Sequence, residues 1–309
     1  MGGCVRAILV ISAMSAVLLA GRASTQSVAP DPQALDLARQ IVAFDGDRER
    51  MSKQLDALGQ LLPSQVGLML SVQDPAQKQK IADLVKARLE TMKDGLVAAR
   101  VSAMAQTYPA DLLQGGLAFR HTPTGEAYRN ATPALNAAAG AALLSDKPTP
   151  VDPAIPQAKL ALIDRILKAQ DVEGSSRKGW RALSAMLNQA GGGAPSTPSA
   201  QDAADETAYV QSVMAAEIQF YAQTFSDAQL ADLVAYFEGP VGHAFQSGAA
   251  RLLATGAPSY ADVMAHTYDH FSDEMCAAVT CTPAQRTQLN DAMAKIQSII
   301  ASVSKLAAG

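Results

Sequence analysis

The feature that most constrains this chain is a segment that occurs twice, at residues 105–128 and 222–245. The two copies align without a gap, at the 117-residue separation of Pro123 and Pro240. The matched positions are apolar or turn-forming. They pair Tyr108 with Phe225, Leu113 with Leu230, Phe119 with Tyr236, Pro123 with Pro240, Gly125 with Gly242, and Tyr128 with Phe245. No carboxylate or histidine is shared, so the repeated part is structural and any chemistry belongs to one copy at most.

Each copy of this segment has the local pattern of two helices joined by a tight corner. In the second copy Ser226 precedes Gln229 by three residues, the spacing of a capping box, so a helix is expected to begin there. The apolar residues that follow fall on one helical face. They are Leu230, Leu233, Val234 and Phe237. Gly239 is predicted to end this helix, and Pro240 suits the first turn of the next because it has no N–H to pair.

The rest of the chain also has helical periodicity. Hydrophobic residues make up 49% of it but aromatic residues only 5%, which favours closely packed helices over a sheet. The pattern predicts helices at 31–45 and 47–62, a connection at 63–74, and a long helix that begins at Asp74 and Pro75. The fold class is therefore predicted to be all-α.

The strongest break in the pattern is a proline-rich stretch at 146–156, where proline disfavours helix at its own position and the one before. The apolar pattern of 35–42 then recurs at 160–167. Two related helical domains in tandem are therefore expected, at 31–145 and 157–272, with 146–156 as the linker. A C-terminal helical hairpin is expected at 273–309. The apolar positions of its last helix are Leu289, Met293, Ile296, Ile300 and Val303.

The run from Tyr236 to Gly242 resembles the aromatic-pair, x-x-Pro-x-Gly signature of the domain of unknown function 2059 family. The motif residues are Phe225, Leu230, Tyr236, Phe237, Pro240 and Gly242. The first copy is degenerate, because Arg120 replaces the second aromatic residue and the pair at 115–116, two glycines, is expected to interrupt its helix. The resemblance implies a mostly helical bacterial envelope protein, and the family has no established activity.

Residues 1–23 have the features of a signal peptide. Arg6 lies before an apolar stretch at 7–20, which is too short to span a bilayer, and 21–23 form a small-x-small cleavage site. The expected location is periplasmic or secreted, with no transmembrane span after cleavage; an uncleaved anchor helix is the alternative. The net charge of −4 and the absence of a basic run argue against nucleic acid as a partner.

Three sets of residues are candidates for a site. Cys276 and Cys281 remain after the signal peptide is removed, and an exported pair so spaced between two helices predicts a disulfide. His266 and His270 have metal-ligand spacing, but oxidised cysteines cannot complete a zinc site with them, and solvent-exposed histidines are the simpler interpretation. His243 could act as a general base in a hydrolase, although Glu126 takes its place in the other copy.

These patterns predict no catalytic residues, no cofactor and no metal. The main hypothesis is a non-enzymatic periplasmic or envelope interaction module whose partner is an unknown protein or envelope component. The alternative is a protein that binds a small apolar or amphipathic ligand between its helices. A histidine-dependent hydrolase or metal protein is the third possibility.

Overall fold

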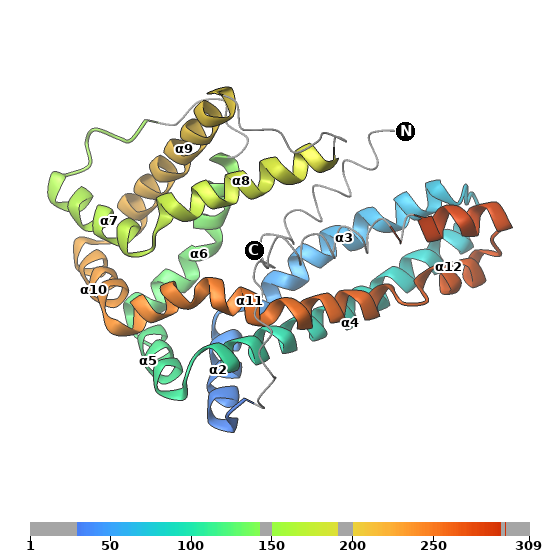
Figure 1. The fold of residues 1–309 in the computed structure, drawn as a ribbon, viewed down its shortest axis with the longest axis horizontal. Coiled ribbons are helices and arrows are strands. Elements are labelled where there is room, and N and C mark those ends of the chain that lie inside the picture. Colours follow the sequence, from blue (N-terminus) through green and yellow to red (C-terminus); the bar gives the residue numbers. More distant parts are fainter. Residues whose placement is uncertain (1–29, 143–149, 191–199, 292–293, 295–309) are drawn as a thin grey trace. The chain divides into compact units, whose positions relative to one another are not determined.

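The computed structural model describes residues 30–142, 150–190, 200–291 and 294, and within these ranges it is helical nearly throughout and has no strand (Figure 1). This confirms the all-α prediction. The helices are α2 (Pro32–Phe44), α3 (Asp47–Met69), α4 (Pro75–Thr107), α5 (Ala110–Arg120), α6 (Pro123–Ala142), α7 (Gln157–Ala169), α8 (Val172–Ala190), α9 (Ala200–Thr224), α10 (Asp227–Glu238), α11 (Pro240–Tyr268) and α12 (Phe271–Val279). In the described part of the chain, no helix combines the length and the apolar character needed to cross a membrane. The predicted signal peptide lies outside the described residues.

Most helices begin and end where local chemistry places them. The side chains of Asp31 and Asp74 each accept a hydrogen bond from a backbone N–H in the first turn of α2 and α4, and a proline follows each cap. Gly46 separates α2 from α3 with a φ of 68°, in the left-handed region that glycine adopts without steric cost. The predicted boundaries at these positions are confirmed.

The predicted connection at 63–74 is wrong over its first half, because α3 continues through Pro63 to Met69. A proline inside a helix costs about 3 kcal/mol, since it removes a hydrogen bond and its ring crowds the preceding turn. Val66 and Leu70 lie beyond it and are only 5% and 1% exposed. Burial of such side chains contributes about 1.5–3 kcal/mol each, so tertiary packing outweighs the local preference.

The described chain forms two compact units that are interleaved in the sequence. Unit 1 comprises 1–110 together with 250–309, and unit 2 comprises 111–249. Both units therefore contain residues from before and after the proline-rich linker. The division between units does not coincide with 146–156, and two successive tandem domains are not confirmed.

Unit 1 consists of α2, α3, α4, the second half of α11, α12 and the residues that follow. Helices α3 and α4 lie side by side, and α12 packs on α4 (Figure 1). The core contains residues from both ends of the chain. Its most buried members are Leu70, Ile81, Val85, Met92, Met275 and Leu289. Val263 and Met264 of α11 pack against the same cluster.

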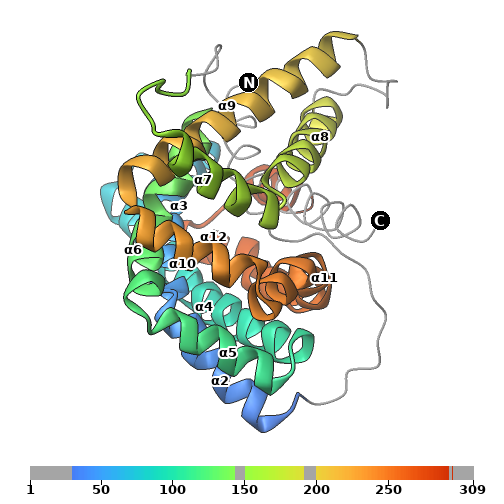
Figure 2. The ribbon, with the colours of Figure 1, turned by 90° about the vertical axis from the view of Figure 1, so that its left-hand side faces the viewer.

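Unit 2 is built around α7, which lies between α9 and α10, while α6 and α8 both pack on α9 (Figure 2). Its core also combines segments from the two sides of the linker. The most buried residues are Ile163, Ile166, Leu167, Tyr221, Leu230 and Leu233. Phe119 of α5 and Leu135 of α6, which precede the linker, belong to this core as well.

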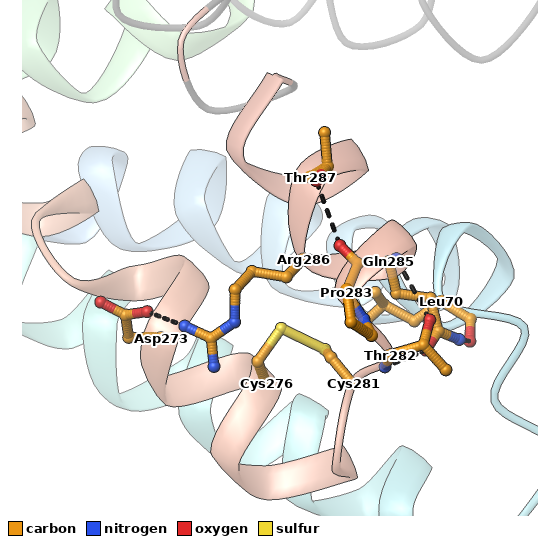
Figure 3. The surroundings of a disulfide bond; sticks show 9 residues. All are labelled: Leu70, Asp273, Cys276, Cys281, Thr282, Pro283, Gln285, Arg286 and Thr287. Atoms are coloured by element: carbon orange, nitrogen blue, oxygen red, sulfur yellow. Dashed lines mark hydrogen bonds and ion pairs between the residues drawn. A yellow bond between two sulfur atoms is a disulfide. The ribbon is translucent and has the colours of Figure 1, made fainter.

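A disulfide between Cys276 and Cys281 closes the C-terminal helical hairpin, as predicted (Figure 3). Thr282 and Gln285 cap the next helix reciprocally: the N–H of Thr282 donates a 2.8 Å hydrogen bond to the side-chain oxygen of Gln285, and the N–H of Gln285 donates one of 3.3 Å to the hydroxyl of Thr282. Arg286 forms an ion pair with Asp273, so the two arms of the hairpin are also joined by charge.

The hairpin is attached to the core of unit 1. The side chain of Gln285 donates a hydrogen bond to the carbonyl of Leu70, and Leu289 is fully buried in the core cluster (Figure 3). The other predicted apolar positions of this last helix lie outside the described residues. They are Met293, Ile296, Ile300 and Val303.

Replacing Cys276 and Cys281 together by serine is expected to lower the free energy of unfolding by about 2 kcal/mol, because the closed loop is short. Thermal unfolding followed by circular dichroism measures this. As a control, a reducing agent should destabilise the wild type by a similar amount and leave the double variant unchanged. Free thiols in the oxidised wild type, detected by mass spectrometry after alkylation, would contradict the prediction.

Candidate functional site

The corner of the second motif copy has the predicted construction. Ser226 and Gln229 form the complete capping box of α10, and α11 begins at Pro240 immediately after Gly239. Gly242 lies so close to the end of α10 that a Cβ atom there would be 2.2 Å from the carbonyl oxygen of Tyr236. Glycine is required because the backbones of the two helices are in direct contact.

The corner of the first copy is built in the same way. A Cβ atom on Gly125 would lie 2.1 Å from the carbonyl oxygen of Phe119, the residue that corresponds to Tyr236. Thr122 caps α6 by accepting a hydrogen bond of 3.0 Å from the N–H of Gly125. The predicted interruption at 115–116 is wrong, because α5 is continuous from Ala110 to Arg120.

The glycines of α5 have a tertiary role instead. A Cβ atom on Gly115 would lie 2.8 Å from Val241, and one on Gly116 would lie 2.4 Å from the ring of Phe245. Both contacts are with α11 in the second motif copy. The absence of side chains at these two positions therefore lets α11 pack closely on α5.

The two motif copies pack against each other within unit 2. The rings of Phe119 and Tyr236, which are equivalent residues, stack with centroids 3.6 Å apart and planes 8° apart. The motif residues Phe225, Leu230 and Phe237 are buried, whereas Pro240 is exposed. Aromatic residues of the motif thus contribute to the interface between its two copies.

A polar cluster adjoins this interface. The side chain of Gln170 donates a 3.1 Å hydrogen bond to the hydroxyl of Tyr128 and accepts one of 3.1 Å from the hydroxyl of Tyr221. Its backbone carbonyl accepts a hydrogen bond from the side chain of Gln246. Burial raises the pKa of both tyrosines, so the hydroxyls stay protonated and serve as hydrogen-bonding groups.

Glu217 is the one group near this cluster that titrates close to neutral pH. Burial raises the pKa of its carboxyl from 4.5 to about 7, and the carboxylate in turn raises the pKa values of Tyr128, Tyr209 and Tyr221. Among the described residues, none forms an ion pair with it. Sequence reasoning missed this residue, although a glutamate in the largely apolar stretch 213–222 was a usable signal.

The equivalent position in the first copy is Arg100, and there the charge is paired. Its guanidinium lies 3.7 Å from a carboxylate oxygen of Asp47, a residue that is only 9% exposed and also pairs with Arg50. Among the described residues, the charge at this position thus has an oppositely charged partner in unit 1, whereas in unit 2 Glu217 has none.

The histidine candidates lie on the surface and are not gathered into a site. His266 is near Asp262, which raises the pKa of the imidazole through a backbone hydrogen bond and its charge. His270 lies 3.5 Å from the carboxylate of Asp269, and His243 is exposed. Within the described ranges, no group of three or more histidine, cysteine, aspartate or glutamate side chains has an arrangement that could hold a metal ion.

Open grooves on the surface of the described part of unit 1 include two of substantial volume. The larger, about 610 Å³, runs between α4 and α12 and has a largely apolar surface. Its lining residues are Lys80, Asp83, Leu84, Ala87, Glu274, Ala277 and Ala278. The second, about 390 Å³, lies on α2, α3 and α4 beside the ion pair of Arg48 with Asp94. Neither groove is lined by a motif residue or a histidine.

Comparisons of the chain with known protein families, with curated proteins and with solved structures gave no match. The resemblance to the domain of unknown function 2059 family therefore stays a prediction.

Proposed function

We propose that this protein is an exported helical module of the bacterial envelope, periplasmic or secreted, that acts by binding another protein or envelope component and not by catalysis. The observation that carries the proposal is the packing of the two copies of the repeated motif against each other. The aromatic residues of the motif pack one copy against the other, which is the behaviour of a scaffold. The disulfide between Cys276 and Cys281 supports an oxidising compartment, and the net charge of −4 argues against nucleic acid as the partner.

The proposal is tested by photo-crosslinking in the envelope. A photoreactive residue is placed at Ala87 of α4 or at Ala231 of α10, two exposed positions that belong to different units. At least one position is expected to give a discrete crosslinked species that recurs between preparations. The absence of such a species from both positions would contradict an interaction module.

The compartment is tested separately on the same cells. The protein recovered from the periplasm or the medium should have the mass of a chain cleaved after Ala23 and two hydrogens fewer than its reduced form. A chain that retains 1–23, or that carries free thiols, would contradict export with signal cleavage.

The groove between α4 and α12 favours a second candidate, the binding of a small apolar or amphipathic ligand. Its volume lies in the range of small-molecule sites, and its apolar floor is bordered by the charged residues Lys80, Asp83 and Glu274. A fluorescent fatty acid is a suitable probe. Ala87→Glu should abolish its binding, the matched change Ala231→Glu should not, and failure of the wild type to bind would exclude this candidate for fatty acids.

A further inference from the structure

The contacts between the two motif copies are related by a twofold exchange. If each residue of one copy is replaced by its equivalent in the other, the stack of Phe119 on Tyr236 maps onto itself. Each contact between a residue of the first copy and a residue of the second should then be matched by a contact between their two equivalent residues. Two further pairs of contacts test this relation.

The first pair involves the starts of α6 and α11. Val241 packs against Gly115, and the exchanged positions are Thr124 and Asp232. These two residues are in contact as well, because the hydroxyl of Thr124 donates a 2.7 Å hydrogen bond to the carboxylate of Asp232. Glycine meets valine on one side, and aspartate meets threonine on the other.

The second pair involves the residues after the aromatic stack. The guanidinium of Arg120 lies 5.6 Å from the centroid of the Phe245 ring. The exchanged positions are Phe237 and Tyr128, whose ring centroids are also 5.6 Å apart. A cation on an aromatic face thus occupies the place of an aromatic pair, which explains how the degenerate first copy keeps its interface.

The helix that follows each corner packs on a helix from the other half of the sequence. Helix α6 precedes the linker but packs on α9, which follows it. Within unit 1, α11 follows the linker but packs on α4, where Cβ atoms on Gly95 and Gly256 would lie 2.8 and 3.1 Å from Val263 and Ala103. Each unit therefore has a core built from both sequence halves.

We propose that the helix–corner–helix motif is a self-pairing element whose partner is a second copy of the same motif. In this chain both copies are on one polypeptide, and their pairing, together with the exchanged helices, holds the two sequence halves together. This arrangement is that of an isologous dimer fused into one chain, since the same surface serves on both sides of the interface. The linker at 146–156 then connects the halves but is not required to keep them associated.

The first experiment cuts the linker. A recognition site for a specific protease is inserted within 146–149 of the full chain, and the purified protein is cleaved without denaturant. The two fragments are expected to elute together in size-exclusion chromatography at micromolar concentration, with unchanged helical circular dichroism. Fragments that separate under these conditions would overturn the proposal, because they would show two successive independent domains.

The second experiment tests the twofold relation in the intact chain. Gly115→Asp alone should lower the denaturation midpoint strongly, because its side chain meets Val241, whereas Val241→Thr alone should change it little. The double variant recreates the threonine–aspartate pair that exists at the exchanged positions. It is expected to regain at least half of the lost midpoint.

Gly95 and Val263 of unit 1 provide the matched control. A Cβ atom on Gly95 would also lie 2.8 Å from the valine, but this pair lies in unit 1, outside the two motif copies. Gly95→Asp should lower the denaturation midpoint, and adding Val263→Thr should restore a clearly smaller share of that decrease than Val241→Thr restores for Gly115→Asp. Equal recovery at both sites, or none at 115 and 241, would overturn the twofold relation.

Discussion

Gly242→Ala is expected to lower the free energy of unfolding by about 3 kcal/mol or more. The new Cβ atom would lie 2.2 Å from the carbonyl oxygen of Tyr236 and 2.8 Å from the Cα atom of Phe237. Both are backbone atoms of α10, so no side-chain rotation can relieve the overlap and the corner itself must open. Guanidinium unfolding followed by circular dichroism measures the loss.

Two further glycines make this result specific. Gly125→Ala should be as harmful, because Gly125 makes the same contact in the first copy. Gly179→Ala in α8 is the control, since nothing lies within 4 Å of the new methyl group. Alanine is the better helix former there, so this variant should gain about 0.5–1 kcal/mol. A Gly242→Ala protein as stable as the wild type would show that the corners are not closely packed.

The stability of unit 2 is expected to fall as the pH rises from about 4.5 to about 7, through the titration of Glu217. In this window the folded chain keeps a proton that the unfolded chain has already released, because burial raises the folded pKa to about 7. Protons therefore favour the folded state. Above pH 7 the full cost, on the order of 3 kcal/mol, is present, whereas below the unfolded pKa it vanishes.

Glu217→Gln tests this dependence, because it keeps the size of the side chain and removes the charge. Near pH 8 it should raise the free energy of unfolding by roughly 2 kcal/mol, after allowance for burial of the amide. Near pH 5 the variant should show no gain. Asp56→Asn, at an exposed position of α3, is the control and should change stability by less than about 0.5 kcal/mol at either pH. A wild-type stability that does not fall across this pH range would contradict the burial of Glu217.

The sequence alone was sufficient for features that depend on neighbouring residues. The caps at Asp31, Asp74 and Ser226, the corner at 239–240 and the apolar face of α10 all follow from contacts within a turn or two of helix. The Cys276–Cys281 pair belongs to the same class, because five residues separate its members. Short-range chemistry of this kind leaves the chain few alternatives.

Some local signals were overruled by packing. Pro63 predicted the end of a helix, but the burial of Val66 and Leu70 carries α3 past it. The glycines at 115–116 predicted a break, but they allow Val241 and Phe245 to approach α5. In both cases packing against residues far away in the sequence decides the conformation.

The sequence by itself predicted the all-α fold, most helix starts, the corner at 239–240 and the cysteine pair. Only the tertiary structure decided that the two copies pair with each other and that the units interleave across the linker. It also decided that Arg100 has a charge partner in Asp47, whereas Glu217 has none among the described residues. The physical reason is the separation in sequence over which each interaction acts. Capping and helical periodicity act between residues a few positions apart, whereas pairing and burial depend on which distant surfaces meet. A duplicated sequence is equally compatible with copies that fold side by side and with copies that exchange helices.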